Sequence, residues 1–326
     1  MTSTDPAAEA PPPGPRTDEG DTPARPAVAL VGAGNAGGAI GARLLARGHD
    51  LAVFDIDPAA RDALVRLGAE AHPDAARAAA TADVTILSLN TAAIVREAVF
   101  GEGGVAHGAP PGATIVDMSS IDPETTRELG ALARKADLHW LDCPLSGGAP
   151  KAATGELAVF AGGDPERFER VRPVLDSLST NCTLVGGPGA GQTVKMINQV
   201  LASLNLQAVA EATRLALDAG LDPSRIPAAL AGGRADGAIL REYMPKMAGG
   251  DATRTGRLDN TLKDLDATLA LAGRLGTRLP ATSLCADVHR GLVERGLGDR
   301  DITALMVHYE PADARDSPAP GGAGER

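Results

Sequence analysis

"AVALVGAGNAGGAIGARLLARGHDLAVFDIDP", residues 27–58, has the pattern of a strand, a glycine-rich turn, a helix and a second strand. The turn carries Gly32, Gly34 and Gly37 in the spacing G-x-G-x-x-G. In a dinucleotide-binding turn the first glycine permits the bend, the second leaves room for a pyrophosphate, and the third lets the helix approach the strand. Asn35 and Ala36 are at the start of the predicted helix, where backbone N–H groups without helical partners can bind phosphate groups. We therefore expect these five residues to bind a cofactor.

An acidic residue follows this turn at the end of the next strand, and it distinguishes a dinucleotide-binding turn from an ordinary glycine-rich one. G-x-G-x-x-G alone also describes an ordinary turn in a chain with 39 glycines. Asp55, however, stands at the ~20-residue spacing of the acids that bind the adenosine ribose. Its carboxylate would repel a 2′-phosphate, so the sequence favours NAD over NADP. The alternative for Asp55 is a strand-end aspartate that binds no ligand.

Outward from this unit, short β-rich runs alternate with Ala-rich helical stretches up to residue 187. This alternation predicts a doubly wound parallel sheet of the Rossmann type. Beyond about residue 190 only helical periods remain. The predicted fold class is therefore α/β plus all-α, with a long connecting helix. The expected strands are 27–33, 50–56, 84–90, 114–119, 139–145, 156–163 and 182–186, and the expected later helices are 192–219, 224–232, 236–248, 258–276 and 280–295.

Four segments are expected along the chain. Residues 26–187 are predicted to form an NAD-binding Rossmann domain, and residues 188–310 a helical domain for substrate binding and dimerisation. Residues 1–25 and 311–326 are rich in Pro, Ala, Gly and charged residues and have no apolar period, so disordered tails are predicted there. Residues 1–25 also lack the basic start and apolar middle of a signal peptide.

Composition narrows the class of function. Hydrophobic residues make up 44% of the 326 residues and charged residues 22%, which is typical of a globular core. A net charge of −11 argues against a nucleic-acid-binding face. No apolar run reaches the ~20 residues of a membrane span. Three scattered cysteines, with no CxxC or HExxH pattern, argue against a metal site and a disulfide framework, so a cytoplasmic setting is expected.

Two further stretches carry polar groups in unusual places. "DCPLSGG" (142–148) puts Ser146, Gly147 and Gly148 directly after an apolar strand, where they can receive a small anion or form a plain turn. "GAGQTVKMINQV" (189–200) puts Lys195, Asn198 and Gln199 on one helical face, because residues at i, i+3 and i+4 are neighbours. Taken alone, these three side chains are as easily explained as solvated surface groups.

In combination, these stretches resemble the β-hydroxyacid dehydrogenases, the family of 3-hydroxyisobutyrate dehydrogenase and tartronate semialdehyde reductase. Four stretches match in the family's order, namely the turn at 32–37, "DCPLSGG" at 142–148, "GAGQTVKMINQ" at 189–199 and "LKDL" at 262–265. "DMSSIDP" (117–123) is similar to the family's segment beside the nicotinamide. The resemblance covers residues 27 to 309, nearly the whole of the expected ordered chain.

The resemblance implies a role for each matched residue. Lys195 would be the catalytic acid and base, and Ser146, Gly147 and Gly148 would hold a substrate carboxylate, with Asn198 and Gln199 orienting substrate and lysine. The implied contacts to the cofactor beyond the glycine turn are Leu89, Asn90, Ser119 and Lys263. Asn90 is a departure, since Leu-Pro is common where this chain has Leu89-Asn90, and we expect it to alter the contacts to the nicotinamide.

The chemistry of hydride transfer agrees with this reading of Lys195. A carbonyl oxygen that gains a hydride on its carbon must also gain a proton, and no histidine lies in any of the matched stretches. A lysine can donate that proton if burial and the positive nicotinamide ring bring its pKa toward neutrality.

We therefore expect an NAD-dependent oxidoreductase that interconverts a short β-hydroxy acid and its semialdehyde. Candidate substrates are 3-hydroxyisobutyrate and tartronate semialdehyde, and other small hydroxy acids remain open. Two other classes are an imine reductase, against which Lys195 argues, and a non-catalytic NAD sensor, against which the complete set of motifs argues. The resemblance also implies a homodimer or homotetramer.

Overall fold

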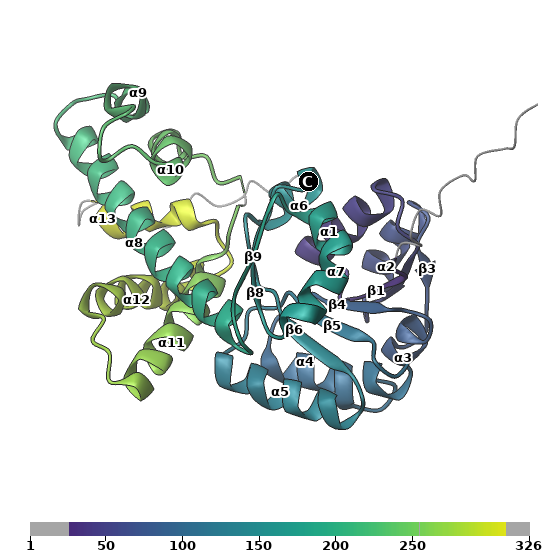
Figure 1. Ribbon diagram of the computed structural model, residues 1–326. Helices are drawn as coiled ribbons and strands as arrows, with labels where there is room; N and C mark the ends of the chain where they lie inside the picture. The colour runs from purple at the N-terminus through teal and green to yellow at the C-terminus, as the bar shows by residue number, and fades with distance from the viewer. Residues whose placement is uncertain (1–25, 254, 311–326) are drawn as a thin grey trace, which may run out of the picture.

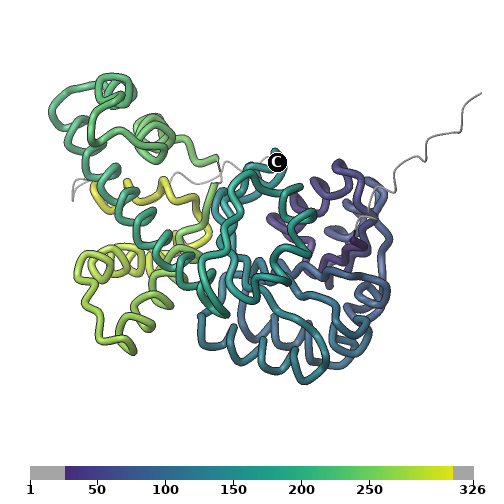
Figure 2. Tube along the Cα trace, viewed as in Figure 1, coloured from purple at the N-terminus to yellow at the C-terminus, as the bar shows by residue number. Residues whose placement is uncertain are grey.

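The computed structural model describes residues 26–253 and 255–310, which form a sheet-containing part and a helical part (Figure 1). The chain crosses once from the first to the second, through one long helix (Figure 2). The tails predicted to be disordered, 1–25 and 311–326, lie outside the described residues.

Six parallel strands form the first part of the sheet. They lie in the order β3-β2-β1-β4-β5-β6, which is the strand order of the dinucleotide-binding fold. Their carboxyl ends therefore meet at one edge, where this fold binds its ligands. The bounds are β1 Val28–Val31, β2 Leu51–Phe54, β3 Glu70–Ala71, β4 Val84–Leu87, β5 Thr114–Asp117 and β6 His139–Asp142.

Three more described strands extend the sheet beyond β6. Strand β8 (Ala158–Gly162) runs antiparallel to β6 and to β7 (Leu145–Ser146), and β9 (Asn181–Gly186) pairs with β8 in parallel. The sheet is thus parallel over its nucleotide-binding half and mixed at its far edge.

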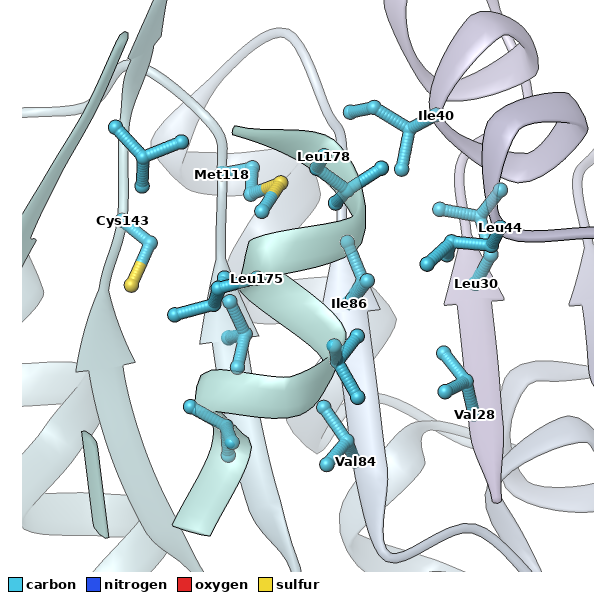
Figure 3. Close-up of a cluster of buried hydrophobic side chains, with 14 of the residues drawn as sticks. Val28, Leu30, Ile40, Leu44, Val84, Ile86, Met118, Cys143, Leu175 and Leu178 are labelled. Atoms are coloured by element: carbon cyan, nitrogen blue, oxygen red, sulfur yellow. The ribbon is translucent and has the colours of Figure 1, made fainter. Parts of the chain in front are cut away.

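Helices cover both faces of the sheet because successive strand residues point to opposite sides. Leu30 and Ile86 pack against α1 and α7, where Figure 3 shows Ile40, Leu44, Leu175 and Leu178. On the opposite face the adjacent strand residues pack against α3, α4 and α5. The bounds are α1 Asn35–Ala46, α2 Pro58–Val65, α3 Ala75–Ala79, α4 Ala92–Phe100, α5 Pro123–Lys135, α6 Gly148–Thr154 and α7 Pro165–Leu178, with a short 3₁₀ turn at Val105–His107.

The helical part is built around α8 (Ala190–Asp218), whose first turns contact the sheet and whose later turns pack against α10, α11 and α12. Its own core includes Leu206, Met244 and Leu292. The other helices are α9 Ile226–Leu230, α10 Ala238–Gly249, α11 Leu258–Leu275, α12 Pro280–Leu292 and α13 Met306–Tyr309, with 3₁₀ turns at Pro223–Arg225 and Ile302–Leu305 and a π-type segment at Val293–Leu297.

The predicted fold class is confirmed, and the predicted strands and helices all appear. Three details differ. The run 139–145 is interrupted at Cys143 and Pro144, because proline cannot donate to a ladder. Strand β3 was not predicted, since it has two exposed residues and no apolar pattern. Strands β8 and β9 run against the direction of β1–β6, so the sheet is not wholly parallel.

Close packing at Gly37 gives a test of the first βα unit. A Cβ on Gly37 would overlap the backbone carbonyl oxygen of Gly32, whereas a Cβ on Gly34 meets no atom within 4 Å. We expect Gly37→Ala to lower the free energy of unfolding by about 1–3 kcal/mol, the usual range for overpacking. Gly34→Ala, the control, should leave it nearly unchanged. Chemical unfolding curves measure both, and equal stability of the two variants would contradict the packing described.

Candidate active site

The glycine turn and Asp55 form a cradle that fits a dinucleotide. Gly32 has φ of +96°, which favours glycine, and Gly34 leaves open space in front of α1. Gly34 is also the N-cap of α1 and makes no side-chain capping bond there. Both Asp55 carboxylate oxygens accept backbone N–H bonds, from Ala33 at 2.5 Å and Asp57 at 2.8 Å. The acid is therefore fixed beside the turn.

The other predicted residues of this turn fall into two groups. Gly34 and Asn35 are exposed and Ala36 is half-buried at the start of α1, so they face the space in which a cofactor would lie. Gly32 and Gly37 are buried, and they allow the bend of the turn and its close packing against the helix. Asp57 caps α2 by accepting from Ala59 N at 2.9 Å, as expected for an aspartate before proline.

A cleft of about 260 Å³ lies where the carboxyl ends of β4 and β5 face α8 and α11. Four of the predicted site residues, from both parts of the chain, line it, namely Asn90, Lys195, Gln199 and Lys263. The structure thus brings together residues that are up to 173 positions apart in the sequence. The remaining lining residues are Thr91, Ala92, Ser120, Ile121, Asp122, Gln192, Met196, Asp264 and Ala267.

Lys195 stands in the second turn of α8 and is half-buried at the cleft. Burial lowers the pKa of Lys195 below that of an ordinary lysine. Two neighbours on α11 act in opposite directions, since the Asp264 carboxylate raises the pKa of Lys195 and the Lys263 ammonium lowers it. None of the six histidines, all of which are described, lines the cleft, so this lysine is the main candidate there for moving a proton near neutral pH.

The two amides beside Lys195 are linked to α11. Gln199 Nε2 donates to Asp264 Oδ2 at 2.7 Å, and Asn198 Nδ2 donates to Gln199 Oε1 at 3.0 Å. Gln199 lines the cleft, whereas Asn198 is not among its lining residues. Lys195 and Gln199 therefore share the cleft-facing side of α8, and Asp264 holds Gln199 from the neighbouring helix.

Lys263 connects α11 to the sheet part. Its Nζ donates to Asn90 O at 3.3 Å and lies 3.4 Å from Asp264 Oδ1. Farther along α11, Arg274 pairs with Glu124 of α5 at 3.1 Å. Helix α11 thus bridges the two parts of the chain.

Leu89 and Ser119 support the wall of the cleft from behind. Leu89 N donates to Ser119 Oγ at 3.1 Å, and Ser119 is only 3% exposed. The next residue, Ser120, is the one that lines the cleft. The contact predicted between Ser119 and the nicotinamide remains a prediction.

Ser146, Gly147 and Gly148 lie at the end of β7 and the start of α6, and they are not among the lining residues of the cleft. Gly147 and Gly148 have φ of +116° and +62°, the left-handed conformation that glycine adopts without strain. Strand β7 contacts α8. The carboxylate-binding role of these three residues stays a prediction.

Asp142 fixes the start of α8, a role that the sequence did not reveal. Its oxygens accept from Gly189 N at 2.8 Å and from Gln192 N at 3.0 Å, and α8 has no capping side chain of its own. Burial raises the pKa of Asp142, and these N–H bonds oppose the rise. On the adjacent strand, burial raises the pKa of Asp117 to about 7. Asp142 and Gln192 were missed as site residues because only the folded chain places them at this junction.

The described residues contain no helix long and apolar enough to cross a membrane. In the same ranges, 26–253 and 255–310, no group of three or more His, Cys, Asp or Glu side chains is arranged to hold a metal ion.

Comparison with known proteins identifies relatives of both parts. The family described as the NAD binding domain of 6-phosphogluconate dehydrogenase matches residues 27–187, and the one described as NAD-binding of NADP-dependent 3-hydroxyisobutyrate dehydrogenase matches residues 189–309. The chain is 36% identical to the 2-hydroxy-3-oxopropionate reductase of Escherichia coli over 87% of this chain and 97% of that one.

Two solved structures are similar along nearly their whole length. A 3-hydroxyisobutyrate dehydrogenase from Salmonella typhimurium has a TM-score of 0.79 at 32% identity, covering 86% of this chain and 99% of that one. A 3-hydroxyisobutyrate dehydrogenase of Mycobacterium tuberculosis, solved with L-serine, has a TM-score of 0.80 at 28% identity. The match covers 88% of this chain and 99% of that one. These matches support an NAD(P) cofactor for the cradle described above.

The open space at Gly34 predicts where the cofactor is most sensitive to substitution. A methyl group there would occupy the position that a pyrophosphate needs. We expect Gly34→Ala to raise the Kd for NADH roughly tenfold or more, a loss of about 1.4 kcal/mol, while the protein stays folded. Titration of NADH fluorescence measures this, and an unchanged Kd would exclude the turn as the phosphate site.

Proposed function

Because the chain belongs to the β-hydroxyacid dehydrogenase family, we propose that it interconverts a short β-hydroxy acid and its semialdehyde with NAD. The observation that carries the proposal is the position of Lys195, which is half-buried and lines the cleft between the two parts of the chain. Candidate substrates are 3-hydroxyisobutyrate and 2-hydroxy-3-oxopropionate, the compounds in the names of the relatives.

Lys195 moves the proton in this proposal. The nicotinamide, when bound, supplies or accepts the hydride. During reduction the Lys195 ammonium donates a proton to the oxygen of the former carbonyl, and during oxidation the neutral amine removes the hydroxyl proton. Burial favours the neutral amine and thereby makes the ammonium a stronger acid. Gln199, which Asp264 holds, orients the substrate beside it.

Ser146, Gly147 and Gly148 are proposed to hold the substrate carboxylate, with Asn198 as a second orienting amide. The support is the resemblance of "DCPLSGG" to the family motif and the contact between β7 and α8. Ser146→Ala should then raise KM about tenfold, since a hydrogen bond to a charged group contributes about 1.5 kcal/mol or more. A normal KM in steady-state assays would remove Ser146 from the site.

We propose NAD as the preferred cofactor because the Asp55 carboxylate is fixed at the end of β2 beside the glycine turn. Arg61 lies nearby, with Nη1 3.4 Å from Asp55 O, and its charge would favour a 2′-phosphate if the carboxylate were absent. Steady-state kinetics with both cofactors test this, and a higher kcat/KM with NADP would contradict the role given to Asp55.

The chain is also proposed to form a homodimer or homotetramer. Helix α8 carries a row of exposed apolar residues at helical spacing, among them Ile197 (54% exposed), Leu201 (60%) and Leu215 (71%). A second copy of the chain would remove this row from water. Light scattering tests the proposal, and a monomer at micromolar concentration would contradict it.

Removal of Lys195 is the main test of the mechanism. We expect Lys195→Ala to reduce kcat by ~10²–10⁴, the range for losing a general acid–base group, with little change in the Kd for NADH. The control is Lys135→Ala, since Lys135 is exposed at the end of α5, away from the cleft. Near-normal turnover by Lys195→Ala would refute the assignment, as would an equal loss in the control.

The two charges on α11 predict opposite shifts of the pH profile. Oxidation needs neutral Lys195, so kcat should rise with pH through the pKa of Lys195. Asp264 raises that pKa, so Asp264→Asn should move the rise to lower pH. Lys263 lowers it, so Lys263→Met should move the rise to higher pH. Measurement of kcat at saturating substrate and cofactor tests both signs, and shifts in the same direction would contradict this electrostatic account.

A further inference from the structure

Gln192 is a buried amide in the first turn of α8 that none of the roles above explains. It is only 1% exposed. Its Nε2 donates to Ser119 O at 2.8 Å and its Oε1 accepts from Ile121 N at 3.2 Å. One side chain of the helix thus holds two backbone groups of the segment that follows β5.

The same segment is also held from the sheet side. Ser119 N donates to Asp117 Oδ1 at 3.0 Å, and Ser119 Oγ accepts from Leu89 N at 3.1 Å. Its outer residues, Ser120, Ile121 and Asp122, line the cleft. Gln192 therefore joins one wall of the cleft to the helix that forms the other.

Gln192 is also tied to the anchor of the helix and to the catalytic candidate. Its own backbone N–H donates to Asp142 Oδ2, and Lys195 follows three positions later on the same helical face. Beside the Asp142 anchor, the Gln192 side chain is thus a second direct link between the helix that carries Lys195 and the 119–122 wall.

We propose that Gln192 is a positioning residue for Lys195, which sets the separation of the proton donor from the wall formed by residues 119–122. This inference rests on the function proposed above. A misplacement of about 1 Å can cost roughly a hundredfold in rate, so turnover should depend on Gln192 although it transfers no proton.

Gln192→Met and Gln192→Glu test the role with side chains of similar length. Gln192→Met makes neither bond, and kcat should fall roughly tenfold to hundredfold at every pH. An ionised Gln192→Glu carboxylate cannot donate to Ser119 O, but its protonated form can donate there and still accept from Ile121 N. The ratio of its kcat to that of the wild type should therefore rise as pH falls.

The charged groups around this position set the pH range of that effect, because they shift the pKa of the introduced carboxyl. They are Asp117 of β5, Asp142 of β6, Asp122 at the start of α5, Lys195 of α8, and Lys263 and Asp264 of α11. Burial of the site and the Asp142 carboxylate both raise the pKa of an introduced carboxyl, and the Lys195 ammonium lowers it. The ratio is measured in the reduction direction at pH values below the pKa of Lys195, where Lys195 is protonated in both proteins and its titration does not contribute.

Thermal unfolding, the Kd for NADH, amide exchange and kcat together show whether the positioning role or the proposed function itself is wrong. We expect both variants to remain folded in thermal unfolding, the Kd for NADH to stay within about threefold of the wild-type value, and amide exchange in residues 117–122 to accelerate in Gln192→Met. A kcat within about twofold of wild type in both variants, or a flat ratio for Gln192→Glu, would overturn the positioning role. A wild type that turns over no hydroxy acid would instead refute the proposed function.

Discussion

The structure depends on the bonds from two N–H groups of α8 to the carboxylate of Asp142. Helix α8 belongs to the helical part of the chain, yet its first turn is anchored on a strand of the sheet. A carboxylate at a helix N-terminus accepts hydrogen bonds from N–H groups that have no partner within the helix. Its negative charge also interacts favourably with the positive end of the helix dipole. The approach is close, since a Cβ on Gly191 would overlap Phe160 O. The anchor therefore fixes Lys195, one turn later, relative to the sheet edge that binds the cofactor.

Electrostatics in the cleft come mainly from neighbouring residues of one helix. Lys263 and Asp264 are adjacent in α11, and they shift the pKa of Lys195 in opposite directions. Lys263 also contacts Asn90 O on the sheet side, and Asp264 holds Gln199. Any movement of α11 would change the charge around Lys195 and the position of its neighbouring amide together. Helix α11 therefore links the pKa of Lys195 to the contacts between the two parts of the chain.

Local patterns predicted the fold and four of the thirteen residues that line the cleft. The glycine turn, the apolar strands and the 3.6-residue periods act over short distances, so the α/β and all-α parts could be read directly from the sequence. Lys195, Gln199, Lys263 and Asn90 were found through motifs. Gln192 and Asp142 were not, because a glutamine in a helix and an aspartate after a strand gain their roles only from partners 47 to 73 positions away. Strand β3 was too short to show a period.

The central claim is that the Lys195 ammonium meets the substrate oxygen inside the closed cleft. A crystal structure of the complex with NAD and a non-reacting hydroxy-acid analogue tests it most directly. The account predicts Nζ of Lys195 within hydrogen-bond distance, ~2.7–3.2 Å, of the analogue's hydroxyl oxygen and shielded from water. A Lys195 side chain turned into bulk solvent, with the analogue bound elsewhere, would contradict it.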